Sequence, residues 1–223
     1  MTTIVAKAFC DRVEILSDGG VLNVTSGSYP LIKTINKVRG SIFAPLAIAG
    51  TGPVGYSDQV AGAVVNWSRQ TGSVDATIGL ARQELKRQRL EGRPPLQPTR
   101  MLIAGISETK GPRLWEFVNH LGTTPEPWCL AEHGPCIRLF GSVPTEAEVA
   151  MIDEATTLAS LVPMMDAFRT RFRRQCNSHV DLTIIHQYGV ETRRLHVWPD
   201  DVIGSPMWTP EDWLAAQNSG HTA

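Results

Sequence analysis

The start of the chain places a hydroxyl and a potential free amine on one residue. Thr2 follows Met1, and methionine aminopeptidases usually remove a methionine that precedes a small residue. Removal leaves Thr2 with both its side-chain hydroxyl and its α-amine. An α-amine has a pKa of about 7.7–8.0, so a good fraction is unprotonated near neutral pH. Such an amine can act as general base for its own hydroxyl, which favours a hydrolase with a threonine nucleophile.

Strands in the first part of the chain must position this residue. Residues 2–9 and 13–16 are rich in β-branched and apolar types, which predicts a β-hairpin. Residues 17–20 end the hairpin, because their two glycines allow a tight turn. Residues 31–38 and 46–49 predict a second pair of strands.

Two helices are expected next. The first begins at Ser57 or Asp58, has apolar residues at helical spacing, and ends at Gly72. Ser73 is a good N-cap for the second helix, which extends to about Leu90. The basic residues near the end of the second helix are interpreted as a solvated face.

The rest of the chain predicts five more strands and two more helices. The strands are expected at residues 100–107, 113–119, 137–140, 180–187 and 191–197. A helix begins within residues 142–146, and Pro163 is expected to end its apolar repeat. A further helix follows at residues 164–174, and the last two strands form a hairpin.

This order of elements does not suit a repeat of βαβ units. It suits two antiparallel sheets packed face to face with a helix layer on each outer side, an α+β fold with four αββα layers. Residues 1–198 are expected to form a single domain and residues 199–223 a C-terminal extension. With 223 residues, 42% of them hydrophobic, the chain can bury a core of this size.

Composition argues against several classes of partner. The formal net charge is −1 with Lys and Arg spread along the chain, whereas a nucleic-acid-binding protein has a basic face. Lys7 and Asp11 interrupt the first stretch, so no signal peptide is expected, and no apolar run approaches a membrane span. The four cysteines form no CxxC pair and no zinc spacing, which indicates reduced thiols. We expect a cytoplasmic protein without a metal, cofactor, nucleic-acid or membrane partner.

Four short stretches, taken in order, resemble one known family. They are Thr2-Thr3-Ile4-Val5, Ser17-Asp18-Gly19, Lys37-Val38-Arg39 and Ile48-Ala49-Gly50. Together they resemble the mature N-terminus, the small-Asp-small turn and two strand segments of proteasome-type β subunits and bacterial HslV-like peptidases. These are N-terminal-nucleophile hydrolases, and the resemblance extends over about residues 2–198.

The resemblance implies a role for each of five residues. Thr2 supplies the attacking oxygen, and Lys37 is the cation that favours the neutral amine. Asp18 holds the lysine by a charge-assisted hydrogen bond. The Gly50 N–H stabilises the oxyanion. Ser142, after a glycine, supports the N-terminal amine, with a simple helix cap as the equally weighted alternative.

The identity of the lysine stays open between two residues. By a direct count the family's lysine aligns with Thr34, so Lys33 comes one residue early and Lys37 three residues late. Lys37 is preferred because it precedes an apolar residue and has close to the family's spacing from Gly50. A short insertion within residues 21–29 explains the offset.

A second support loop is less complete. Asn177-Ser178 resembles the family's other support loop, but Gln175 stands where the family often has an aspartate. The histidines, His179 among them, show no triad-like partner in the sequence and are interpreted as structural.

The resemblance implies a threonine endopeptidase, a hydrolase that works inside a ring of identical subunits. Its substrates are unfolded polypeptides, and an ATP-dependent unfoldase is a possible partner. Two alternatives remain. One is a catalytically silent ring or scaffold protein, favoured by the displaced lysine and the missing aspartate. The other is a non-proteolytic amidase on the same fold.

Overall fold

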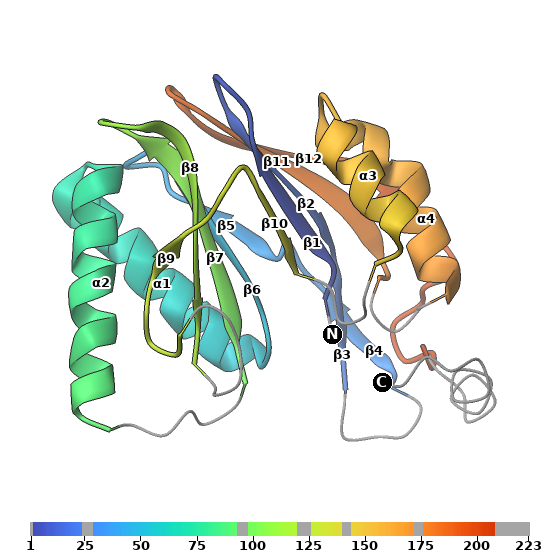
Figure 1. Cartoon of the computed structure of the whole chain (residues 1–223). Helices are drawn as coiled ribbons and strands as arrows, with labels where there is room; N and C mark the ends of the chain where they lie inside the picture. Colours follow the sequence, from blue (N-terminus) through green and yellow to red (C-terminus); the bar gives the residue numbers. More distant parts are fainter. Residues whose placement is uncertain are drawn as a thin grey trace.

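The computed structural model describes residues 2–23, 29–92, 98–119, 126–139, 144–171 and 176–207. Within them, two large sheets lie between two pairs of helices (Figure 1). Helices α1 (Val54–Thr71) and α2 (Val74–Leu90) cover the outer face of one sheet. Helices α3 (Glu146–Glu154) and α4 (Val162–Arg171) cover the outer face of the other. The described strand pairs are all antiparallel, which confirms the α+β class.

The first large sheet holds the start of the chain. Its strands, in spatial order, are β10 (Cys136–Leu139), β1 (Ile4–Ala8), β2 (Val13–Asp18), β11 (His179–His186) and β12 (Gly189–Val197). The hairpin predicted at the start of the chain is confirmed, with Ile4 opposite Ser17. The predicted closing hairpin is confirmed as well.

The second large sheet carries the strand that contains Gly50. Its strands, in spatial order, are β5 (Val38–Gly40), β6 (Leu46–Thr51), β7 (Arg100–Ser107), β8 (Gly111–Val118) and β9 (Ala131–Glu132). A separate two-stranded sheet joins β3 (Gly20–Leu22) to β4 (Leu31–Thr34).

Both faces of the central strands are apolar because both faces are covered. In β1, Ile4 and Ala6 pack between the two sheets, whereas Val5 packs with the cluster under α3 and α4. In β6, Ala49 packs between the sheets and Ile48 packs under α1 and α2. Successive side chains of a strand point to opposite faces, so a strand covered on both sides needs apolar residues throughout. The first residues of the chain are thereby fixed in the core.

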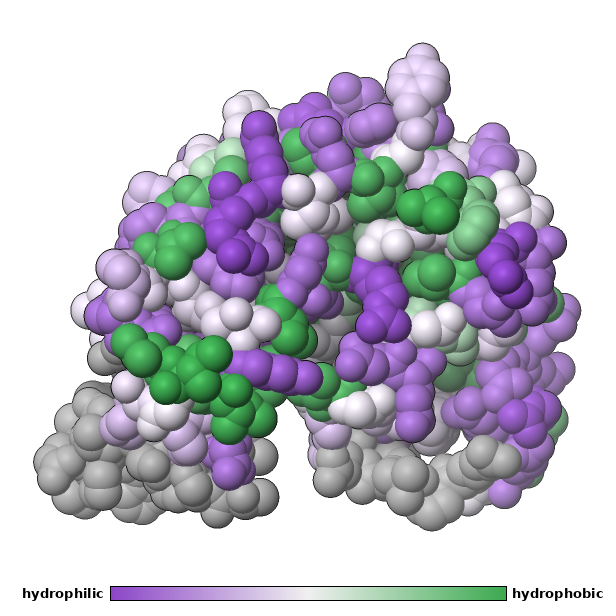
Figure 2. All heavy atoms as spheres, turned by 180° about the vertical axis from the view of Figure 1, so that it is seen from behind, coloured by the Kyte–Doolittle hydropathy of each residue, from purple (hydrophilic) through white to green (hydrophobic). Residues whose placement is uncertain are grey.

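Some large apolar side chains remain in contact with solvent. Figure 2 shows apolar residues gathered at one edge of the molecule, beside the grey residues. Ile32, Val202 and Ile203 are 50%, 56% and 61% exposed. A backbone hydrogen bond from Gly204 N to Leu31 O brings the two segments together. We call Ile32, Val202 and Ile203 the apolar patch.

The strand predicted at residues 31–38 is wrong as one element. It divides into β4, which pairs with β3, and β5, which pairs with β6. Asn36 Oδ1 accepts a hydrogen bond from Val38 N at 2.9 Å, and Ile35 N donates to Gly19 O at 2.8 Å. Such local side-chain bonds offer the backbone an alternative to a sheet ladder. The chain therefore turns at this point, and Lys37 lies in the turn.

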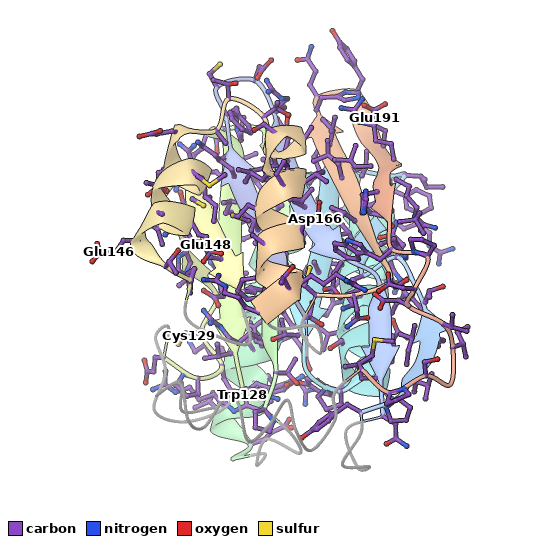
Figure 3. All side chains as sticks on the ribbon, turned by 90° about the vertical axis from the view of Figure 1, so that its right-hand side faces the viewer. Trp128, Cys129, Glu146, Glu148, Asp166 and Glu191 are labelled. Carbon is purple, nitrogen blue, oxygen red and sulfur yellow. The ribbon has the colours of Figure 1, made fainter. Side chains whose placement is uncertain are left out.

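The prediction that Pro163 ends a helix is also wrong. Helix α3 ends at Glu154, a 3-10 turn covers Leu158–Leu161, and Pro163 lies in the first turn of α4. Proline is tolerated in a first turn because its missing N–H has no partner there. Lys7 Nζ donates to three carbonyl groups at the end of α3, those of Ile152, Asp153 and Ala155. Figure 3 shows α3 and α4 as separate helices, with Asp166 on α4.

The first two helices follow the predicted boundary but not the predicted start. Helix α1 begins at Val54, ahead of Ser57; Pro53 is its N-cap and has an extended backbone, with φ −63° and ψ 128°. Gly72, at a left-handed φ of 63°, ends α1 as predicted. Ser73 caps α2 as predicted and accepts from Ala76 N. None of the described helices is both long and apolar enough to cross a bilayer.

Candidate active site around Thr2

Strands β1 and β2 bring the start of the chain against Asp18. Thr3 N donates a hydrogen bond to Asp18 Oδ1 at 2.8 Å, and Asp18 N donates to Thr3 O at 3.2 Å. Thr3 and Asp18 are fully buried, and Thr2 is 8% exposed. Thr3 thus both donates a hydrogen bond to Asp18 and accepts one from it. Because Thr3 directly follows Thr2, these two bonds fix the position of Thr2.

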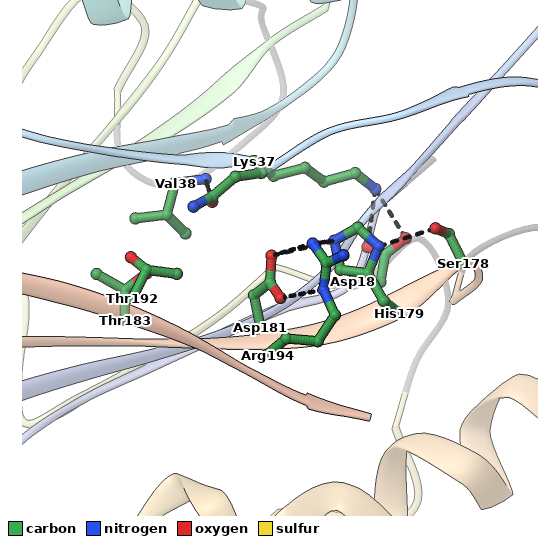
Figure 4. Close-up of polar contacts among 10 residues, drawn as sticks. Asp18, Lys37, Val38, Ser178, His179, Asp181, Thr183, Thr192 and Arg194 are labelled. Carbon is green, nitrogen blue, oxygen red and sulfur yellow. Dashed lines mark hydrogen bonds and ion pairs between the residues drawn. The ribbon is translucent and has the colours of Figure 1, made fainter. Parts of the chain in front are cut away.

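Lys37 reaches the same carboxylate from the turn between β4 and β5. Its Nζ lies 2.8 Å from both Asp18 Oδ1 and Asp18 Oδ2, and its side chain is 6% exposed (Figure 4). Lys33, the other candidate lysine, lies opposite Val21 in the two-stranded sheet and is exposed. The structure therefore joins Lys37, and not Lys33, to Asp18.

A cavity of about 450 Å³ opens beside Thr2. Thr2, Lys37 and Gly50 all line it. Gly20, Val21 and Leu22 form one side, and residues 50–53 form another. Three of the predicted site residues therefore line one cavity, and Asp18 contacts this cavity through its ion pair with Lys37.

The strand edge at Gly50 is open toward this cavity. Gly50 and Thr51 pair with β7, but the pairing of β5 with β6 ends at Ala49. A Cβ on Gly50 would lie 2.3 Å from the sulfur of Met101 and 3.1 Å from the Arg100 carbonyl oxygen. A Cβ at this position would therefore require the Met101 side chain to move, and glycine leaves backbone rather than side chain facing the cavity.

The turn after Asp18 is packed against a segment that precedes β11. A Cβ on Gly20 would lie 1.3 Å from Asn177 Oδ1, and a Cβ on Gly19 would lie 1.9 Å from the His179 ring. Real Cβ atoms do not approach other atoms so closely, so both positions need glycine in this packing. The two glycines thus allow Asn177 and His179 to press against the backbone beside Asp18.

The interpretation of His179 as a histidine without a triad-like partner is wrong. Its Nδ1 lies 2.9 Å from Ser178 Oγ and its Nε2 lies 3.0 Å from Asp181 Oδ2 (Figure 4). Arg194 Nε donates to Asp181 Oδ1 at 2.9 Å. Ser178, His179 and Asp181 are 5%, 2% and 3% exposed. Because no substrate can reach this buried serine, the group holds the segment beside Asp18 in place. The signal in the sequence was the spacing of His179 and Asp181, which points both to one face of a strand.

Asp201 is a second residue that sequence reasoning missed. Asp201 Oδ2 accepts from Ser178 N at 2.8 Å, and Asp201 Oδ1 accepts from Arg169 at 2.7 Å. Its side chain is fully buried. Gln175, expected to replace a support-loop aspartate, lies outside the described residues. A carboxylate more than twenty positions later in the chain therefore supports Ser178, which no local pattern could indicate.

Two ionisable groups near this site have shifted pKa values. Burial raises the pKa of the Cys176 thiol well above its usual range, so Cys176 stays protonated and is not a nucleophile. Burial also acts to raise the pKa of Asp181, but hydrogen bonds from His179 and Arg194 outweigh it and hold that pKa below its usual value. Asp181 is therefore a carboxylate at neutral pH.

Ser142 lies outside the described residues, so its predicted support of the amine stays a prediction. In the described part of the chain, no group of three or more His, Cys, Asp or Glu residues is arranged to hold a metal ion. The chemistry that the described groups offer is a hydroxyl, a buried lysine–carboxylate pair and the backbone of Gly50 at the cavity wall.

The fold has a counterpart among solved structures. No protein-family model matches the chain, and no curated protein matches it. Its structure is similar to that of Anbu (ancestral beta-subunit) from Yersinia bercovieri, with a TM-score of 0.62 and 12% sequence identity. The match covers 98% of this chain and 93% of the Anbu chain. At this identity the likeness concerns the fold alone.

Proposed function

We propose that the protein is a threonine endopeptidase whose nucleophile is Thr2 after loss of Met1. The observation that carries the proposal is that Thr2, Lys37 and Gly50 line one cavity, with Lys37 held by buried Asp18. The structural likeness to Anbu (ancestral beta-subunit) from Yersinia bercovieri supports the same reading, since it extends over 98% of this chain.

The proposed reaction has two stages. The Thr2 hydroxyl passes its proton to the α-amine, directly or through a water, as its oxygen attacks the substrate carbonyl carbon. The peptide C–N bond breaks, the leaving amine takes up that proton, and an ester to Thr2 remains. Water then adds to the ester, which releases the carboxylic acid and restores the hydroxyl. The positive charge of Lys37 favours the neutral amine, and Asp18 fixes the position of Lys37.

Substrate is proposed to bind as an extended strand. Gly20 and Val21 on one side of the cavity and Gly50 and Thr51 on the other present backbone next to Thr2. Backbone hydrogen bonds from such edges hold a peptide without reading its side chains. The Gly50 N–H is proposed to stabilise the oxyanion, which develops on the carbonyl oxygen as the carbon is attacked.

The proposed assembly is a homo-oligomeric ring that encloses these sites. The two sheets and the two helix pairs are proposed to form the four-layer αββα sandwich of N-terminal-nucleophile hydrolases. Unfolded polypeptide is the proposed substrate, and an ATP-dependent unfoldase is a possible partner. A cytoplasmic location is proposed from the sequence.

Hydrolysis of a broad peptide library tests the proposal. Met1-free wild-type protein is expected to cleave peptides, Thr2→Ser to retain part of the activity, and Thr2→Ala to lose it by several powers of ten. Circular dichroism of each variant serves as the folding control. Equal cleavage by wild type and Thr2→Ala would contradict the proposal. No cleavage by any variant would favour a silent scaffold, and cleavage of small amides alone would favour an amidase.

A further inference from the structure

Two opposite charges lie at the wall of the Thr2 cavity. Arg39, on β5, and Asp58, on α1, both line it. One guanidinium nitrogen of Arg39 lies 3.2 Å from Asp58 Oδ1, and the other lies 3.3 Å from the Asp58 carbonyl oxygen. Their side chains are 47% and 56% exposed. Lys37, the other cation of the cavity, is already neutralised by Asp18.

Much of the remaining wall is apolar, although Ser57 also lines it. Buried apolar side chains come from both the second sheet and α1, namely Ile48, Ala61 and Met101. A side chain that enters here leaves water and meets hydrocarbon, so a charged group must find an ionic partner or lose its hydration without compensation. Among the described residues that line the cavity, Arg39 and Asp58 are the ionic groups besides Lys37, and each already has the other as its partner.

We propose that the Arg39–Asp58 ion pair sets which peptides this site accepts, and that the intact pair selects an uncharged apolar side chain before the scissile bond. The inference rests on the proposed function. To react, the substrate carbonyl carbon must come within about 3–3.5 Å of the Thr2 hydroxyl oxygen, so the side chain next to it enters the adjoining cavity. Protease specificity pockets select in this way by the charge they present.

Each charge of the pair also suppresses the wrong substrate. An acidic side chain that pairs with Arg39 must displace Asp58, which repels it. A basic side chain that pairs with Asp58 must likewise displace Arg39, which repels it. Removing one member should therefore open the cavity to the opposite class. Asp58→Asn leaves Arg39 uncompensated and favours acidic side chains. Arg39→Gln leaves Asp58 uncompensated and favours basic ones.

The pair suits such a test because it is half exposed. Exposed ion pairs contribute little to stability, so both variants are expected to fold. The same exposure limits the effect: we expect each change to shift the preference by about fivefold, less at high salt, because solvent and ions screen exposed charges. Lys110, paired with Glu132 at a similar exposure but not part of the cavity, offers Lys110→Gln as the matched control.

The experiment measures rates of Thr2 labelling by peptide epoxyketones that differ only in the residue before the ketone: Leu, Asp or Lys. Wild type and Lys110→Gln are expected to react fastest with the Leu peptide. Asp58→Asn should raise the Asp-to-Leu rate ratio, and Arg39→Gln the Lys-to-Leu ratio. Labelling of Thr2 with ratios unchanged in both variants would overturn this inference and leave the proposed function intact. No labelling of Thr2 by any peptide would overturn both.

Discussion

Lys37 Nζ lies 2.8 Å from each carboxylate oxygen of Asp18, in a place where neither side chain is open to water. Asp18 is the last residue of β2 in the first sheet, and Lys37 lies in the turn before β5 of the second sheet. Asp18 also accepts the Thr3 N–H. This pair therefore connects the start of the chain to the cavity wall and to the second sheet. Each residue of the pair compensates the charge of the other, which would otherwise be buried alone.

Replacing Lys37 is expected to cost both activity and stability. Lys37→Ala removes the cation proposed to favour the neutral amine and leaves the buried carboxylate of Asp18 uncompensated. Breaking a buried pair costs about 3–5 kcal/mol, so the free energy of unfolding should fall by that order. Lys33→Ala, at an exposed residue of β4, should change neither quantity. Urea unfolding and peptide hydrolysis, the latter at a temperature where both variants are folded, measure the two effects. Loss of hydrolysis in Lys33→Ala alone would transfer the role to Lys33.

Two glycines make a matched pair for packing. Gly20→Ala is expected to destabilise the fold by about 1–3 kcal/mol, because its Cβ would collide with Asn177 Oδ1. Gly79→Ala should instead stabilise it by up to about 1 kcal/mol, since Gly79 lies within α2 and its Cβ would have nothing within 4 Å. Chemical denaturation of both variants measures whether the free energy of unfolding falls in Gly20→Ala and rises in Gly79→Ala. A Gly20→Ala protein as stable as wild type would show that the segment before β11 is not packed as described.

The sequence was most informative where a local rule applied. Alternation and apolar content placed β1, β2, β7 and the closing hairpin, and Gly72 with Ser73 located the junction of α1 and α2. It failed where a distant partner decided the outcome. Helix α3 ends where Lys7, far away in the chain, takes up its last carbonyl groups. The sequence pattern that predicts the β1–β2 hairpin does not show that Lys7 of this hairpin contacts α3.

The candidate site shows the same division. Thr2, Lys37 and Gly50 were proposed from short motifs, and they line one cavity. The support around Ser178 was not foreseen, because it depends on Asp201 and Arg194, which reach Ser178 and its neighbours only in the folded chain. Ser142 lies outside the described residues, so its role is still a prediction.

Acid is expected to weaken the group formed by His179, Asp181 and Arg194. The pKa of Asp181 is lowered in the folded state, so its ionised form stabilises the fold above the unfolded-state pKa of about 3.9. That contribution is lost as the pH falls through the lower, folded-state pKa. Asp181→Asn should therefore be less stable than wild type at pH 7, with a difference that narrows below about pH 4. Thermal unfolding across this pH range measures the difference. A stability difference between wild type and Asp181→Asn that stays constant with pH would contradict the role given to ionised Asp181.

Self-association is expected from the apolar patch and from the homo-oligomeric ring proposed above. Ile32, Val202 and Ile203 are at least half exposed, and Figure 2 shows apolar residues gathered at one edge. Contiguous apolar surface of this kind commonly marks an interface between proteins. We predict a homo-oligomer of at least about six subunits, as closed rings require repeated copies of one interface. Light scattering at micromolar concentration measures the mass, and a monomer would refute the ring.

Covalent labelling shows whether Thr2 is the nucleophile. Met1-free protein is treated with a peptide epoxyketone, and digested peptides are mapped by mass spectrometry, with Thr2→Ala as the control. We expect a single adduct on the peptide that begins with Thr2 and none in Thr2→Ala, because only the wild type offers the hydroxyl beside a free amine. An adduct on another residue, or no adduct on folded protein whose N-terminus is Thr2, would contradict it.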